Sequence, residues 1–178
     1  MSERLEAVEG NLIVLNQAVE VLNRLDDRIY AAGGARDGRS PVGAHFRHVF
    51  DHYHAFLAGL PQGAIDYDRR RRGTPLEQER RLAVSAALGL IADIGRLPSD
   101  LGDRDLRVTL RSVTDRDGEP DWSRSSVKRE LQFLVSHTVH HFALIKEALK
   151  LEGVEAGAEF GVAPSTLASS RRPAACAQ

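Results

Sequence analysis

Length, composition and charge limit what this chain can be. With 178 residues it is long enough for one domain with a real core and rather short for two. Its 24 lysines and arginines balance 25 aspartates and glutamates, so charge gives no reason to expect nucleic acid or an acidic membrane surface as a partner.

The chain shows no signature of export or membrane insertion. No stretch approaches the roughly 18 apolar residues that span a bilayer, and "MSERLEAVEGN" lacks the basic start and apolar run of a signal peptide. The single cysteine, Cys176, allows no intramolecular disulfide, which fits a reducing compartment. We therefore expect a soluble, cytoplasmic protein with no membrane partner.

Two helices are predicted in the first sixty residues. Over the first thirty, apolar residues recur every three or four positions, which predicts one long helix, and "AAGGARDGR" then reads as a loop. Ser40 and Pro41 form a typical helix start, so a second helix is predicted from there to Pro61. The apolar positions of the two helices are Leu5, Val8, Leu12, Leu15, Val19, Leu22, Ile29, Val42, Val49, Phe56, Leu57 and Leu60.

A third helix follows an exposed connection, "PQGAIDYDRRRRG". Thr74 and Glu77 have the spacing of a capping box, which predicts that the helix starts there and continues to about Leu97, before Pro98. Its predicted inward residues are Leu82, Ala86, Leu90, Ile94 and Leu97.

The helical spacing of apolar residues gives way to alternation after the third helix and resumes near Ser126. "LRVTLRSV" alternates apolar and polar residues and "DRDGEPDW" offers an Asp-Gly turn, which predicts a short β-hairpin over Leu106–Trp122. From about Ser126 the helical period resumes, ending at Gly153. Within the remainder only "EFGVAPSTL" is expected to pack. These elements predict an all-α domain over residues 1–165, a four-helix bundle with a short hairpin between its third and fourth helices, and a flexible tail over residues 166–178.

All seven histidines fall in two short segments, "VGAHFRHVFDHYH" and "SHTVHH". At about 100° per residue, His45, His48 and His52 share one face of the second helix. His137 and His141 are four residues apart on the last helix and lie one above the other. His54 and His140 point away and are not expected to bind metal. Two neighbouring helices can thus aim one histidine of the first segment and two of the second at a single point.

The point at which these histidines would meet suits one metal ion. Neutral imidazole binds zinc, nickel and iron, and three histidines leave coordination positions open, as catalytic sites do. Of the first segment, His48 is the preferred ligand, and His45 and His52 are alternative ligands or outer partners. Glu130 shares the face of His137 and is either a general base or fourth ligand, or an acidic residue that suits the first turn of its helix.

The residues resemble a known family. A histidine on the second helix followed by His-x-x-x-His on a later one is similar to the DinB/YfiT-like superfamily of metalloenzymes, over about residues 5–165. The segments "VGAHFRHVFDHY", "IDYDRRRRGTPLE", "RELQFLVSHTVHHFALI" and "FGVAPSTL" resemble a bacterial DinB-like subfamily. The resemblance implies that His48, His137 and His141 bind zinc, nickel or iron in an open cavity, and that the cosubstrate is a low-molecular-weight thiol such as mycothiol or bacillithiol.

The leading hypothesis is a mononuclear metal-dependent enzyme, a transferase, isomerase or hydrolase that activates a thiol or water for a small-molecule substrate. Glu130, Tyr53 and Arg129 are its candidate catalytic residues, and Tyr67 and Arg47 are further candidates for substrate binding. One alternative is a non-catalytic metal- or ligand-binding module, stress-linked or dimeric. Another is a metal-free bundle whose histidines only pack. A homodimer is an expectation for bundles that bury an extra apolar stripe.

Overall fold

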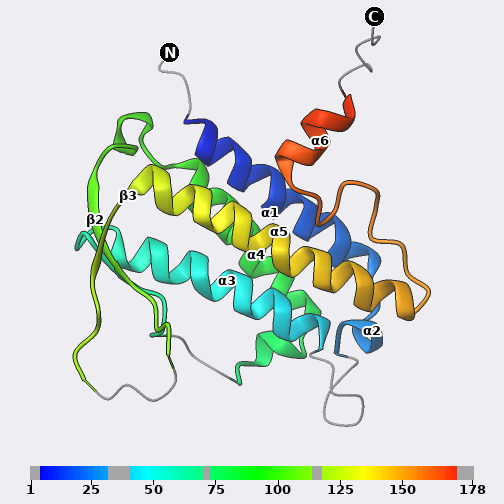
Figure 1. Ribbon diagram of the computed structural model, residues 1–178. Helices are drawn as coiled ribbons and strands as arrows, with labels where there is room; N and C mark the ends of the chain where they lie inside the picture. Colours follow the sequence, from blue (N-terminus) through cyan, green and yellow to red (C-terminus); the bar gives the residue numbers. More distant parts are fainter. Residues whose placement is uncertain (1–4, 32–40, 70–72, 114–117, 172–178) are drawn as a thin grey trace, which may run out of the picture.

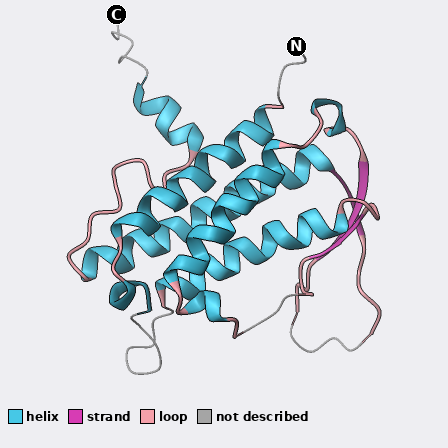
Figure 2. Cartoon of the chain, turned by 180° about the vertical axis from the view of Figure 1, so that it is seen from behind, coloured by secondary structure: helices cyan, strands magenta, loops and turns pink. Residues whose placement is uncertain are grey.

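The chain folds into long helices with a small sheet at one end (Figures 1 and 2). The computed structural model describes residues 5–31, 41–69, 73–113 and 118–171. Its α-helices are α1 (Glu6–Arg24), α2 (Asp27–Ala31), α3 (Val42–Gly59), α4 (Arg80–Gly95), α5 (Val127–Leu151) and α6 (Pro164–Arg171). The 3-10 helices are η1 (Pro75–Glu77) and η2 (Ser99–Leu101), and the strands are β1 (Ala64–Asp66), β2 (Asp105–Thr109) and β3 (Ser123–Ser126). Within the described residues no helix is long and apolar enough to cross a bilayer.

The four long helices share one apolar core. α1 packs against α4 and α5, and α3 packs against the same two helices from the other side. In Figure 1, α3 and α5 lie side by side in front of α1 and α4. The fully buried large side chains come from all four helices and include Leu15, Leu22, Phe46, Phe50, Phe56, Leu90, Ile94 and Phe142. The predicted helical class is therefore correct.

The first predicted helix is two helices. Leu25 is extended (φ −79°, ψ 146°) and ends α1, although its side chain stays buried. The Asp26 side chain then accepts a hydrogen bond from the Ile29 amide (2.6 Å), which caps α2. Continuous apolar spacing hides this break, because Leu22, Leu25 and Ile29 remain buried on both sides of it.

The third predicted helix begins later than the sequence suggested, and a different face of it points to the core. Thr74 makes no side-chain capping bond, residues 75–77 form η1, and α4 starts only at Arg80, so the predicted capping box is wrong. Leu90 and Ile94 are buried as predicted, but Ala83 and Ala87 are buried in place of Leu82 and Ala86. Small residues on the inner face let α4 pack closely against α1 and leave Leu82 exposed.

The predicted hairpin is part of a three-stranded sheet in the order β1-β2-β3. β2 and β3 are antiparallel, with Leu106 opposite Ser125, so the second strand lies just beyond the predicted range. β1 pairs parallel to β2. It belongs to the segment predicted as an exposed connection, which is wrong for Ile65 and Tyr67, since both are buried.

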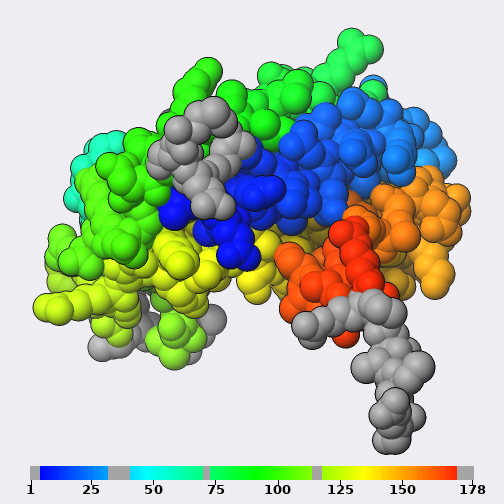
Figure 3. Space-filling view, turned by 90° about the horizontal axis from the view of Figure 1, so that it is seen from above, coloured from blue at the N-terminus to red at the C-terminus, as the bar shows by residue number. Residues whose placement is uncertain are grey.

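The C-terminal part of the chain folds back along the long helices. α5 starts close to the predicted position, where Ser126 caps it by accepting a hydrogen bond from the Arg129 amide, and Gly153 follows its end with φ 73°. The Phe160 ring stacks on Phe142 (4.3 Å between centroids), so the "EFGVAPSTL" segment packs as predicted. α6 then continues to Arg171, so the boundary predicted at residue 165 falls inside a helix; Figure 3 shows residues 154–171 in orange and red beside α1.

Some predicted features lie outside the described residues: the Ser40 cap, most of the "AAGGARDGR" loop, the Asp117 turn position, Cys176 and residues 172–178 of the tail.

Two glycines fix the axial position of α3. A Cβ on Gly43, near the start of the helix, would collide with the Glu77 carbonyl of η1, and one on Gly59, at its end, would collide with the Ala64 carbonyl of β1. The backbone therefore approaches α3 closely at both ends, which only glycine allows. The histidines of α3 lie between these two contacts.

Candidate metal centre

Five histidines gather where α3 and α5 lie side by side. The two helices are antiparallel, because the His45 ring lies near that of His141 (5.3 Å between centroids) while His52 lies near His137 (4.0 Å). His48 lies between, 5.0 Å from His137 and 4.5 Å from His141. The predicted convergence of the two segments is confirmed.

Three of these side chains can hold one metal ion. His48, His52 and His137 each offer one ring nitrogen, and these nitrogens lie within 4.8 Å of one another. The Nε2 atoms of His48 and His137 are 3.2 Å apart. Two nitrogens at 2.0–2.1 Å from a tetrahedral zinc would be about 3.3 Å apart. The spacing therefore suits two imidazoles on one ion as well as it suits a hydrogen bond between them.

The backbone fixes the tautomer of His52. Its Nδ1 lies 2.9 Å from the carbonyl oxygen of His48. A carbonyl oxygen can only accept, so Nδ1 carries the proton and Nε2 keeps its lone pair. A ligating histidine is commonly oriented by such a bond from its other ring nitrogen. His52, 3% exposed, is therefore presented in the form that a metal needs.

Burial and crowding keep His137 uncharged. Burial, and then the neighbouring His52, His141 and His48 rings, together lower the pKa of His137 to about 2. A neutral imidazole can bind a metal without first losing a proton. The buried Nδ1 of His137 has no hydrogen-bond partner among the described residues.

The remaining histidines differ in their contacts. His45 and His141 contact each other through their Nδ1 atoms (3.1 Å), and burial, then nearby His140, lower the pKa of His45. His141 lies beside the three-histidine group, with its ring 4.6 Å from that of His137. His54 and His140 are exposed, as the sequence predicts for residues that point away.

A buried carboxylate, that of Glu130, is linked to the histidine group through Tyr67. Glu130, 5% exposed, accepts hydrogen bonds from the hydroxyls of Tyr67 (2.8 Å) and Ser125. The Tyr67 ring stacks on His52 (5.4 Å, 22° between planes), and Phe133 contacts both rings. Burial, and then the Glu130 charge, raise the pKa of Tyr67, which keeps it protonated as the donor.

Sequence reasoning named Glu130 and Tyr67 but missed Ser125 and Phe133. Phe133 precedes His137 by four residues, so helical spacing alone could have placed it on the same face. Ser125 had no such signal, because its contact with Glu130 depends on how β3 leads into α5.

The other predicted residues lie apart from the histidines. Tyr53 is fully buried; its hydroxyl donates to Asn11 Oδ1 (2.7 Å) and accepts from Thr138 (3.3 Å), which ties α3 to α1 and α5. Arg129 is exposed at the start of α5, eight residues or about 12 Å along the axis from His137. Arg47 forms ion pairs with Asp51 and Glu77.

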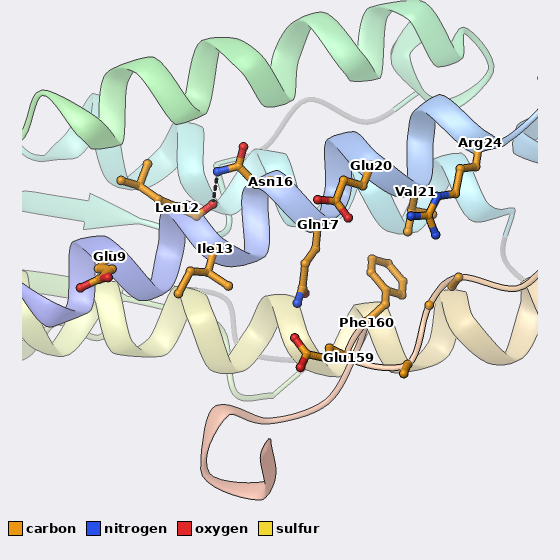
Figure 4. Close-up of a pocket in the computed structure, with 13 residues that line it drawn as sticks. Glu9, Leu12, Ile13, Asn16, Gln17, Glu20, Val21, Arg24, Glu159 and Phe160 are labelled. Carbon is orange, nitrogen blue, oxygen red and sulfur yellow. Dashed lines mark hydrogen bonds between the residues drawn. The ribbon is translucent and has the colours of Figure 1, made fainter. Parts of the chain in front are cut away.

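Three hollows in the described part of the surface lie away from the histidines. One of about 670 Å³ separates α1 from residues 156–160 and is lined by Gln17, Glu20 and Phe160 among others (Figure 4). Another, of about 580 Å³, lies between α1, α5 and α6, and a third, of about 220 Å³, lies beside the sheet. None of these three is lined by a histidine of the cluster.

Comparison with known proteins gives little further guidance. No family model matches the chain, and no solved structure matches it. FK506-binding protein 5 of Rhizopus delemar is 31% identical over 103 residues, which are 58% of this chain and 26% of that protein. The chain thus spans about a quarter of the length of this curated relative, and the match assigns it to no family.

Proposed function

We propose that the chain is a metal-binding protein of the DinB/YfiT-like type, a four-helix bundle that holds one divalent zinc, nickel or iron between α3 and α5. His48, His52 and His137 are the proposed ligands. The observation that carries the proposal is the convergence of their three ring nitrogens within 4.8 Å. The fixed tautomer of His52 and the neutral state of His137 support it.

We further propose that the protein is a metal-dependent enzyme acting on a small molecule, with a low-molecular-weight thiol or water as the activated group. A divalent ion held by three imidazoles lowers the pKa of a thiol or water that binds beside them. Of this chain's own residues, Tyr67 and Glu130 hold the His52 face of the site, and Phe133 gives it an apolar wall.

The first test is the metal content of tag-free protein, measured by inductively coupled plasma mass spectrometry. We expect about one equivalent in the wild type, none in His137→Ala, and an unchanged value in His54→Ala. The last variant is the matched control, because it removes an exposed histidine from α3. Protein that stays metal-free after refilling with zinc, nickel or iron would overturn the proposal in favour of a metal-free bundle.

A second candidate function is metal binding without turnover. Its support is that the three described hollows lie away from the histidines. Cobalt(II)-loaded protein separates the two functions: a visible spectrum that changes when a thiol such as bacillithiol is added indicates open coordination and an enzyme. A spectrum that no thiol or small anion changes indicates closed coordination and a binding module.

A further inference from the structure

Glu130 is the one carboxylate that is buried in the described part of the chain. The Tyr67 hydroxyl donates a hydrogen bond to one of its oxygens, and the Ser125 hydroxyl donates to the other. A carboxyl group whose two oxygens both accept is in its ionised form, since a protonated one would donate from one of them. The bundle thus encloses a negative charge in its interior.

No positive side chain of the described residues pairs with this carboxylate. The ion pairs that these residues form lie elsewhere. Arg129 is next to Glu130 in the chain, but it is exposed, so water screens its charge. A buried charge is costly unless a partner or a metal ion compensates it. The two hydroxyls satisfy the hydrogen bonds of Glu130 and leave its charge without a counter-charge.

One aromatic layer separates this carboxylate from the histidine group. Tyr67, which donates to Glu130, stacks on the His52 ring, and Phe133 contacts both rings. Tyr67 is 2% and His52 3% exposed, so this path is shielded from solvent. Glu130 precedes His137 by seven residues on α5, which is about 10 Å along the axis. At that distance and an effective dielectric constant of about 20, one negative charge changes the affinity for a divalent ion about a hundredfold.

The charges of a metal-loaded site would balance with one bound anion. Neutral imidazoles add no charge, so a divalent ion together with Glu130 carries a net charge of about +1. One monoanionic donor, such as a thiolate or a hydroxide, brings this sum to zero. A dianion would leave an excess negative charge in the interior, which is costly.

We propose that Glu130 is the buried counter-charge of a divalent metal ion held by the histidine group, and that the loaded site takes one monoanion. This inference rests on the proposed function and deepens it. Glu130 is not among the residues whose ligand atoms converge, so it acts through its charge and not as a ligand. That charge strengthens metal binding and weakens the binding of an anion to the metal. A residue that served only packing would affect both in the same direction.

The test removes the charge of Glu130 and keeps the shape of its side chain. In Glu130→Gln the amide oxygen can still accept from Tyr67, and the amide nitrogen can donate to Ser125, whose hydroxyl also accepts. Zinc affinity is measured by competition with a chromophoric chelator, and azide affinity by titration of cobalt(II)-saturated protein in the visible spectrum. We expect zinc to bind about 10- to 100-fold more weakly and azide about tenfold more tightly than in the wild type.

Two further variants control for charge and for folding. Glu147→Gln removes the same charge from an exposed position of α5. It should change neither affinity, because solvent screens that charge. Ser125→Lys leaves Glu130 in place and sets an ammonium group beside it. This variant should reproduce both shifts, and it serves if Glu130→Gln does not fold.

The possible outcomes separate this inference from the proposed function. Zinc and azide affinities that fall together in Glu130→Gln, or that both stay unchanged, overturn the inference and leave the metal centre intact. Zinc binding by the wild type without any response of the cobalt spectrum to azide does the same. Wild-type protein that binds no zinc overturns the proposed function and this inference with it.

Discussion

α5 presents one set of buried polar groups toward α1 and another toward α3. The two sets differ greatly in how fully their hydrogen-bonding groups are paired. Toward α1, Thr138 donates to Tyr53, Tyr53 donates to Asn11, and Asn11 donates to the carbonyls of Ala7 and Leu131. Toward α3, the Nε2 atoms of His137 and His48 face each other, and His137 Nδ1 has no hydrogen-bond partner among the described residues.

The difference indicates which set is structural and which is a site. A buried network in which every donor meets an acceptor stabilises the fold and has no capacity left for a ligand. Neutral imidazoles whose ring nitrogens face one another retain that capacity, at some cost in stability. On this reasoning Tyr53, a catalytic candidate in the sequence, is structural, and the histidines are the proposed binding site.

The largest expected effect is stabilisation by metal. Zinc at about 1,000 times its dissociation constant should add about 4 kcal/mol to the free energy of unfolding. For a chain of this size that raises the melting temperature by roughly 8–16 °C. Differential scanning calorimetry with and without zinc measures the shift, and His48→Ala should show none. An equal shift in that variant would place the zinc elsewhere.

Breaking the satisfied network should cost stability without affecting metal. Tyr53→Phe leaves Asn11 Oδ1 without its donor and removes the acceptor of Thr138. We expect the free energy of unfolding in urea to fall by about 1–3 kcal/mol. Zinc affinity measured on the same preparation should stay unchanged. A Tyr53→Phe protein that loses zinc would mean that the two regions are coupled.

The network should also make the protein sensitive to high pH. Burial raises the pKa of Tyr53, so in the folded state it stays protonated at a pH where the unfolded chain ionises. Stability is then fully present below pH 10 and falls above it, by up to about 1.4 kcal/mol per pH unit for one tyrosine. Urea unfolding between pH 9 and 11 should show a shallower loss in Tyr53→Phe. Equal slopes would exclude Tyr53 as the cause.

The smallest expected effect concerns the metal-free cluster. Replacing both His48 and His137 by leucine removes both members of a facing polar pair, which is commonly neutral or stabilising. We expect the metal-free double variant to match the wild type within about 1 kcal/mol, or to exceed it, in urea unfolding. A clear loss of stability would show that the histidines serve the fold, as in the metal-free alternative.

The sequence predicted the long helices because their apolar faces repeat regularly. Leu90 and Ile94 are buried as expected, and α5 begins close to Ser126, where the helical period was predicted to resume. It could not predict the break at Leu25, whose side chain stays buried while the backbone changes direction. Nor could it predict β1, a three-residue strand whose partner lies about forty residues further along the chain.

From the residues alone the site was predicted as a group of histidines with His48 preferred, and the family resemblance implied the set His48, His137 and His141, whereas the group whose nitrogens converge is His48, His52 and His137. Helical angles placed His45, His48 and His52 on one face, and only the register of α3 against α5 decides which of them meets His137. That register depends on contacts distant in sequence. The same limit explains Glu130, whose role follows from Tyr67 just after β1 and Ser125 on β3 rather than from its place in the first turn of α5.

Gly43 and Gly59 make that register vulnerable from outside the site. Each is a place where a neighbouring carbonyl occupies the space of a Cβ, so a side chain at either position would shift α3 from its place against η1 or β1 and disturb its register with α5. A random mutagenesis screen for loss of metal binding should therefore return substitutions at these two glycines together with those of the histidines. In such variants every ligand would still be present in the sequence, and the defect would be one of alignment.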